Sequence, residues 1–307
     1  MTNDKDKKKE LIAVIGLFLA ALCWGISYPL TKYVEACPTF YIIAIRFFVA
    51  AAVLAIAFWK SFKDINKEVI KSAFILSFII SSMYIFNIWG IKYTTSVKAS
   101  FFTCLSFLIV PVINYFAYKL KISKIIVISA LICLVGMFLL CYAPGMGGLM
   151  INIGDILCFI ASIAGSVNII YIEKVSKNSN INSTLFTILL MAFVSLWGII
   201  IALFRGEMDY TCTQPELISI IVMGLFCSAA AFMLQTRFEA LVPSNRVGVI
   251  FALEPASGCI LSVLLLKETM VLTGWIGAAV IMASILYMEV ANNRIEAKKL
   301  AAAQRIS

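Results

Sequence analysis

The sequence contains no histidine, and only 13% of its 307 residues are charged. Histidine is the commonest metal ligand and a frequent general base, so its absence argues against a zinc peptidase and against a Ser-His or Cys-His hydrolase. The Walker A loop, Gly-x-Ser-x-Gly and Gly-x-Gly-x-x-Gly are also missing. An intramembrane aspartyl protease needs two membrane aspartates, and Asp155 is the single candidate. We therefore expect no enzymatic activity, no cofactor and no bound metal.

The nine cysteines are scattered, and no two of them form a Cys-x-x-Cys pair. Their spacing indicates neither a metal site nor a redox motif. Cys37 and Cys212 fall in loops that we place on the same outer side, which leaves a disulfide between them open.

Apolar residues are in excess, at 62% of the chain, and the mean hydropathy is +1.00. Soluble chains carry about 45–50% apolar and about 25% charged residues, whereas apolar runs of about 20 residues can cross a bilayer as helices. The first run follows a charged stretch, but no cleavage site comes after it, so we expect an uncleaved span. We predict an all-α integral membrane protein with ten transmembrane helices, at residues 11–31, 38–59, 71–91, 97–118, 124–142, 153–173, 183–204, 216–236, 247–266 and 271–290.

Lysine and arginine are unevenly divided between the two sets of loops. With the N-terminus inside, the inner segments hold nineteen of these residues and the outer segments hold five. Positive residues collect on the cytoplasmic side of membrane proteins. The sequence therefore predicts a multi-pass protein of the cell membrane with both termini in the cytoplasm, and topology explains the net charge of +9 without a nucleic-acid partner.

A weak internal repeat relates the two halves of the chain. A shift of about 148 residues places Asn87 on Gln235 and Leu105 on Leu253. Because each half has five spans, an odd number, the second half must lie inverted in the membrane, as in many transporters. We predict two five-helix repeats at 11–143 and 144–290, flanked by cytoplasmic tails at 1–10 and 291–307.

Two ionisable residues lie deep within predicted spans, where a charge is costly and is expected to face the bundle interior. At 1.5 Å per residue, Glu254 and Arg46 lie about 12 Å deep from opposite sides. Glu254 either couples transport to protons or substrate, or packs and gates helices beside Pro255. Arg46 either pairs with Glu254, directly or through water, or extends to the outer interface.

Several uncharged side chains complete the set of candidate cavity residues. Trp24 lies past the middle of the first span, where its indole N–H needs a partner, and Gly25 and Pro29 allow a bend beside it. Polar groups in other spans either line a pore or bond between helices. The substrate-cavity candidates are Trp24, Tyr28, Arg46, Asn87, Ser106, Gln235 and Glu254.

Over about residues 11–290 the chain resembles the EamA-like branch of the drug/metabolite transporter superfamily. The first half carries Cys23-Trp24-Gly25, Arg46-Phe47, Thr94-Thr95-Ser96 and Ala99-Ser100-Phe101. The second half carries Leu234-Gln235, Leu253-Glu254-Pro255, Glu268 and Gly274-Trp275-Ile276-Gly277-Ala278-Ala279. Lys267 departs from the family pattern, which usually has glycine before the glutamate.

The resemblance implies ten helices in two inverted repeats around a central cavity. It also implies a secondary carrier of small metabolites, often an exporter of amino acids or related compounds. We therefore expect a small-molecule substrate, the lipid bilayer as environment, and alternating access. The rival hypothesis is a non-transporting membrane receptor or scaffold. The spacing of Gly274 and Ala278 permits a homodimer.

Overall fold

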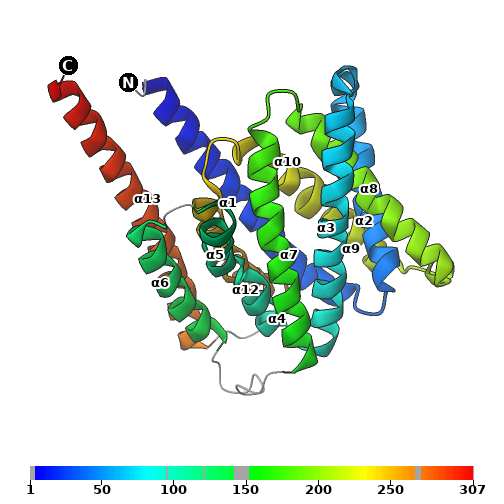
Figure 1. The fold of residues 1–307 in the computed structure, drawn as a ribbon. Coiled ribbons are helices and arrows are strands. Elements are labelled where there is room, and N and C mark those ends of the chain that lie inside the picture. The colour runs from blue at the N-terminus through cyan, green and yellow to red at the C-terminus, as the bar shows by residue number, and fades with distance from the viewer. Residues whose placement is uncertain (1–3, 95, 120–121, 142–151, 267–270, 307) are drawn as a thin grey trace.

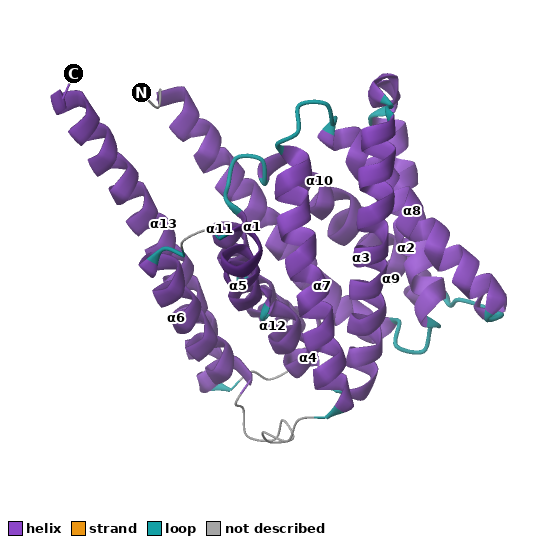
Figure 2. Cartoon of the chain, in the orientation of Figure 1, coloured by secondary structure: helices purple, strands orange, loops and turns teal. Residues whose placement is uncertain are grey.

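The structure is a computed structural model, and it describes residues 4–94, 96–119, 122–141, 152–266 and 271–306. Within these residues the chain is helical and has no strand (Figures 1 and 2). The motif residues Thr95, Lys267 and Glu268 lie outside this set, as do the side chains of Ser96 and Ser100. The helices are α1 (Asp4–Tyr33), α2 (Thr39–Ala57), η1 (Trp59–Asp64), α3 (Lys67–Tyr93), α4 (Ser96–Cys104), α5 (Ser106–Tyr118), α6 (Lys124–Cys141), α7 (Ile153–Ser176), α8 (Ser183–Phe204), η2 (Glu207–Asp209), α9 (Gln214–Val222), η3 (Met223–Ala230), α10 (Ala231–Phe238), α11 (Ser244–Phe251), α12 (Leu253–Leu266) and α13 (Leu272–Ile306).

Eight helical segments of the described chain are long and apolar enough to cross a membrane. They are Lys8–Thr31, Thr39–Ala57, Lys67–Tyr93, Phe101–Tyr118, Ile153–Ser176, Ser183–Phe204, Gln214–Phe238 and Leu272–Asn292. Of the other two predicted spans, 124–142 corresponds to the shorter apolar helix α6, and 247–266 is divided at Ala252 between α11 and α12. The chain is a multi-pass membrane protein, and the count of ten stays a prediction.

Two predicted spans are broken at corresponding places. The helix of 97–118 is interrupted at Leu105, between α4 and α5, and that of 247–266 at Ala252, between α11 and α12. Both residues have nearly the same backbone angles, φ −59° and ψ −6° at Leu105 and φ −61° and ψ −9° at Ala252. Such breaks expose backbone groups, which membranes tolerate only where protein or a cavity surrounds them.

Both chain termini lie at the same end of the molecule, here called the terminal face (Figure 1). Its connections include η1 and the loop 177–182, which are tied by a hydrogen bond from Asn182 Nδ2 to Asp64 Oδ2 of 2.5 Å. The opposite face carries the loops 34–38 and 205–213, where Phe40 N donates to Glu207 Oε2 at 2.9 Å. The predicted tails are largely helical, since α1 begins at Asp4 and α13 ends at Ile306.

Helix packing places α1 and the η3–α10 segment in the middle of the bundle. α1 packs on α12 and α10, α2 on α8 and η3, α3 on α7, and α6 on α13. Large apolar side chains such as Phe116 and Phe204 are exposed, as expected where lipid is the solvent. Gly274 and Ala278 are buried within the chain, so their spacing serves internal packing, and a homodimer stays a prediction.

Candidate functional site

A central cavity lies among α1, α3, α4, α5, α7, α10 and the α11–α12 break. Five of the seven sequence candidates line it: Trp24, Tyr28, Asn87, Ser106 and Glu254. Cys104 and Ser106 flank the first helix break, and Phe251 and Glu254 lie beside the second. The two interruptions therefore open onto the same space, which explains how a membrane bundle accommodates them.

Glu254 lies in the first turn of α12 and faces the cavity. Pro255 follows it. Proline lacks a backbone N–H, and it is tolerated in the first turn of a helix because the N–H groups of that turn have no intrahelical partners. The partial positive charge at a helix N-terminus favours a carboxylate there. Tyr28 OH donates to Glu254 Oε1 at 2.9 Å, so α1 and α12 together hold the acid in place.

The Tyr28–Glu254 contact depends on a close approach of α1 and α12. A Cβ added to Gly25 would lie 2.0 Å from Ser257 Oγ and 2.9 Å from Gly258 N. α1 continues as one helix past Pro29. Gly25 allows two helix backbones to touch.

Arg46 is 4% exposed and lies in the bundle interior, not at a membrane interface. Its guanidinium donates to Ser228 Oγ at 2.7 Å, to Tyr84 OH at 3.3 Å and to the Cys227 carbonyl at 3.4 Å. Cys227 and Ser228 belong to the π-helical segment η3. The altered backbone hydrogen bonding of a π-helix can leave a carbonyl oxygen available to the Arg46 guanidinium, and π-bulges often occur at functional sites.

Arg46 and Glu254 make no ion pair within 4.0 Å in the described structure. They are separated by tyrosines, because Arg46 bonds Tyr84 and Glu254 accepts from Tyr28. The Arg46 guanidinium also lies over the Tyr84 ring, with Cζ 4.9 Å from its centroid. The direct ion pair that the sequence allowed is therefore absent from the described residues, and a bridge through water stays a prediction.

Two buried polar atoms in the cavity wall have no protein partner among the described residues. They are Trp24 Nε1, a donor, and Asn168 Oδ1, an acceptor. Trp24 is held by edge-on contacts with Phe232 and Phe251, at centroid distances of 5.5 and 4.9 Å. A buried polar group left unpaired costs about 1–3 kcal/mol, so a ligand or water that satisfies these atoms is favoured.

The remaining polar candidates divide between the cavity and helix interiors. Asn87 Nδ2 donates to Thr103 Oγ1 at 2.8 Å, which joins α3 to α4 at the cavity wall. Ser162 and Ser166 instead donate to carbonyls of their own helix. Gln235 does not line the cavity; its Nε2 donates to Glu239 Oε1 at 2.8 Å.

Two smaller cavities lie between the central cavity and the opposite face. The middle one is lined by Arg46 and shares Tyr28 and Asn87 with the central cavity. The outermost one shares Thr31 with the middle one and includes Lys92. The three spaces therefore lie one after another between Glu254 and the opposite face.

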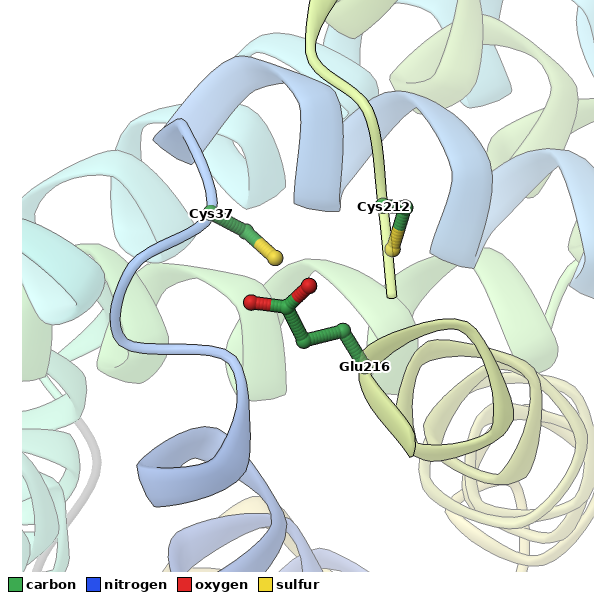
Figure 3. A group of neighbouring side chains, drawn as sticks. All are labelled: Cys37, Cys212 and Glu216. Atoms are coloured by element: carbon green, nitrogen blue, oxygen red, sulfur yellow. The ribbon is translucent and has the colours of Figure 1, made fainter. Parts of the chain in front are cut away.

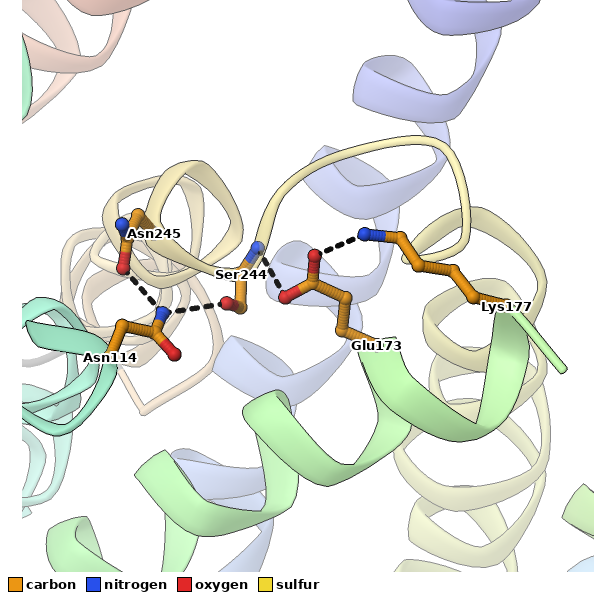
Figure 4. A network of polar contacts seen from close by, with 5 residues as sticks. All are labelled: Asn114, Glu173, Lys177, Ser244 and Asn245. Atoms are coloured by element: carbon orange, nitrogen blue, oxygen red, sulfur yellow. Dashed lines mark hydrogen bonds and ion pairs between the residues drawn. The ribbon is translucent and has the colours of Figure 1, made fainter. Parts of the chain in front are cut away.

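Toward the terminal face the helices are joined by polar contacts. Asn114 Nδ2 donates to Ser244 Oγ at 2.9 Å and to Asn245 Oδ1 at 2.6 Å (Figure 4). Ser244 N donates to Glu173 Oε2 at 3.1 Å, and Lys177 pairs with the other oxygen of Glu173 (Figure 4). These bonds connect α5, α7 and the start of α11.

A second set of contacts reinforces this end. Arg246 forms ion pairs with Glu10 and Glu289, each at 2.5 Å, and its side chain is only 6% exposed. These pairs join α11 to α1 and α13. Charged pairs that are withdrawn from water and geometrically fixed hold elements together more firmly than exposed ones.

Glu239 is a buried acid that the sequence did not single out. It is fully buried at the end of α10, and its Oε2 has no partner among the described residues. Burial raises the pKa of Glu239 well above its usual range, and nearby Glu173 adds to the rise. Its position beyond the apolar run made it look like an ordinary loop residue.

A multi-pass helical bundle with a partly polar cavity inside it has the construction of a membrane transporter. The chain belongs to the EamA-like transporter family, within the drug/metabolite transporter superfamily. The family's sequence profile matches residues 11–142 and again residues 152–289. Transporters are usually not enzymes, in keeping with the missing catalytic motifs.

Two curated relatives span most of the chain. An uncharacterized transporter of Archaeoglobus fulgidus is 29% identical over 286 residues, covering 91% of this chain and 86% of the relative. The uncharacterized transporter YetK of Bacillus subtilis is 25% identical over 293 residues, covering 91% and 87%. A solved structure described as "Crystal structure of protein" has a TM-score of 0.76 at 17% identity, covering 92% of this chain and 98% of the other, and shares the fold.

Proposed function

We propose that the protein is a secondary transporter that moves a small amphipathic, amino acid-like metabolite across the cytoplasmic membrane by alternating access. Export is the expected direction. Both termini face the cytoplasm in this proposal, so the terminal face is cytoplasmic and the opposite face is external. The lysine and arginine distribution supports this orientation.

The observation that carries the proposal is the different construction of the two sides of the central cavity. Two further cavities lie between it and the opposite face, whereas Asn114, Glu173, Ser244 and Arg246 hold the helices together at the terminal face. This is the arrangement expected of one end state of a carrier. In the other end state the terminal contacts would part and the path past Arg46 would close.

The chemistry of the cavity wall supports an amphipathic substrate. Glu254 offers a carboxylate for an ammonium group, and Trp24 Nε1 offers a donor for a carboxylate or carbonyl oxygen. Phe232 and Phe251 supply apolar wall between them. A site with a few placed polar groups in an apolar lining is typical of small-molecule recognition.

We further propose that the chain is built as two inverted five-helix repeats, 11–143 and 144–290. The nearly identical breaks at Leu105 and Ala252 support this arrangement, because they fall about one repeat apart. Discontinuous helices facing a central site are a feature of inverted-repeat transporters.

A cavity-filling variant tests transport through this space. Gly165 lines the cavity, and a Cβ there would meet only Met83 Sδ, at 3.4 Å. Gly165→Phe should fold, because its ring enters the cavity, and it should stop uptake or efflux of compounds from a broad metabolite panel in proteoliposomes. Gly165→Ala is the matched control and should keep most of the flux. Wild-type vesicles without flux for any compound, or Gly165→Phe with full flux, would count against the proposal.

The orientation has its own test. Reporter tags on the two termini should both be protected in intact cells and accessible in inverted vesicles. A tag exposed at the cell surface would reverse the assignment of the two faces.

A further inference from the structure

The side chains of Cys37, Cys212 and Glu216 point toward one another (Figure 3), and none of them lines the three cavities described above. Cys37 lies in the loop between α1 and α2, Cys212 in the segment between η2 and α9, and Glu216 in the first turn of α9. Both cysteines are free thiols. The two Sγ atoms and a carboxylate oxygen all lie within 4.8 Å of one another, although the cysteines are far apart in the sequence.

These donors match the ligand preference of zinc and similar thiophilic divalent cations. Zinc is bound by cysteine sulfur at about 2.3 Å and by carboxylate oxygen at about 2.0–2.2 Å, so tetrahedral sulfur ligands stand about 3.8 Å apart. The ligand atoms now lie within 4.8 Å of one another, so metal binding would shorten these distances by at most about 1 Å. Side-chain rotation within two loops can supply this shortening.

Neighbouring groups orient the Glu216 carboxylate. Tyr210 OH donates to Oε1 at 3.0 Å, and Thr213 donates to Oε2 through its backbone N at 2.8 Å and through Oγ1 at 2.7 Å. A carboxylate has about four lone-pair sites, so these three bonds leave one for a metal. Metal-binding carboxylates are characteristically held by such outer hydrogen bonds.

The cluster holds acidic and thiol groups but no cation. Glu216 is 8% exposed, and it forms no ion pair with a lysine or arginine in the described part of the chain. Cys37 is fully buried, whereas Cys212 is half-buried, so an ion would enter past Cys212. Water from that side can fill a fourth coordination position, as in zinc sites with three protein ligands.

We propose that Cys37, Cys212 and Glu216 bind one thiophilic divalent cation of the zinc class, with water as the fourth ligand. Binding displaces the S–H proton of each cysteine to solvent, forms two metal–sulfur bonds and one metal–oxygen bond, and involves no oxidation. The ion joins the α1–α2 loop to the start of α9. A disulfide would use the two sulfurs alone, whereas a metal ion would also use the carboxylate that lies beside them.

The site also adjoins the proposed transport path. Val34 and Glu35, in the same loop as Cys37, line the outermost cavity. A bound ion would fix this wall of the entrance and slow flux, an effect that rests on the proposed function. Binding itself does not depend on transport.

Binding is tested on the purified full chain in detergent, stripped with a chelator and titrated with Cd²⁺ as a spectroscopic probe. We expect one ion per chain, a thiolate-to-metal charge-transfer band in the ultraviolet, and displacement by Zn²⁺. Tyr210→Phe, which removes an outer hydrogen bond, should weaken binding about 10- to 100-fold. Glu216→Gln should weaken it further while keeping the helix cap, because glutamine also serves at that capping position.

The double variant Cys37→Ser/Cys212→Ser keeps the other seven of the nine cysteines and should lose the band. Cys23→Ser is the matched control, since Cys23 is a half-buried thiol in α1, and it should bind like wild type. Cys212→Ala replaces the double variant if that one is not monodisperse. A wild-type band unchanged in these cysteine variants, no bound ion, or a stable Cys37–Cys212 disulfide found by mass spectrometry would overturn the proposal.

Slowing by Zn²⁺ is measured separately in proteoliposomes, where it should disappear in the double variant. Wild-type flux that is insensitive to a bound ion would overturn the effect on the entrance. Absence of flux in all vesicles would instead count against the proposed function and leave the binding result intact.

Discussion

The contact between α1 and α12 at Gly25 makes a quantitative prediction. In Gly25→Ala the new Cβ would lie 2.0 Å from Ser257 Oγ and 2.9 Å from Gly258 N. The hydroxyl can rotate away from its bond to the Glu254 carbonyl, 2.8 Å long, but the backbone nitrogen cannot. Overpacking costs about 1–3 kcal/mol, and the glycine-to-alanine gain in helix propensity returns about 0.5–1 kcal/mol. The two ranges leave a net loss of about 0–2.5 kcal/mol, and the middle of that range, about 1.2 kcal/mol, is a factor of roughly 8 in the folded-to-unfolded ratio.

The assay is SDS titration of the purified protein from mixed micelles, followed by fluorescence. Gly248→Ala is the matched control, because its Cβ would meet nothing nearer than Phe107 Cα at 3.4 Å, and it should be neutral or more stable. Gly25→Ala/Ser257→Gly should recover part of the loss, since the Gly258 backbone remains in place. If Gly25→Ala is as stable as Gly248→Ala, the close approach that positions Tyr28 against Glu254 is wrong.

Three further predictions concern ionisable groups. If Glu254 couples flux to protons, Glu254→Gln should abolish pH-driven flux in proteoliposomes, while substrate binding and protein level stay near those of the wild type. Failure of this variant to fold would instead favour a role of Glu254 in helix packing. Burial raises the pKa of Glu239, so this side chain is protonated while the terminal face is closed, and the face should open more readily as the pH rises through that pKa. Hydrogen exchange of residues 239–243, corrected for intrinsic rates, should show this opening. The same pH dependence in Glu239→Gln would refute the prediction. Burial raises the pKa of the Cys37 thiol to about 12, so without metal its thiolate fraction at pH 8 is about 10⁻⁴, against about a quarter for an ordinary thiol. Maleimide should then modify Cys37 about a thousandfold more slowly than an exposed cysteine, and the rate at Cys37 should rise about tenfold for each unit of pH. Fast labelling of Cys37 at neutral pH, mapped by mass spectrometry, would contradict its burial.

Much of the candidate site follows from one rule, that polar groups within an apolar run face the bundle interior. Trp24, Tyr28, Asn87 and Glu254 lie at the cavity because lipid cannot satisfy their polar atoms. The same rule places Arg46 inside the bundle. None of this required knowledge of which helices are neighbours.

The same rule does not predict which side of each helix faces the cavity. Gln235, like Asn87, is a polar residue within an apolar run, yet it bonds to Glu239 away from the cavity. Asn168 and Tyr84 line the cavity but do not stand out from other polar residues in their spans. A helix has one angular orientation about its axis, and packing against neighbours sets it.

The helix breaks were equally hidden. Leu105 and Ala252 are ordinary helix-forming residues, and neither is a glycine or a proline. Their interruptions depend on neighbouring helices that leave space for the freed backbone groups. The cluster of Cys37, Cys212 and Glu216 likewise arises from two loops whose proximity no spacing in the sequence reveals.

The sequence by itself determined that this chain enters the bilayer repeatedly and buries its few intramembrane charges, because hydration energies act on each segment independently. Tertiary structure decided the rest: Tyr28 rather than Arg46 bonds Glu254, and the polar residues of several distant helices line one cavity. Those outcomes depend on close contact between segments distant in sequence, such as Gly25 against Gly258, where a single Cβ would change which side chains meet.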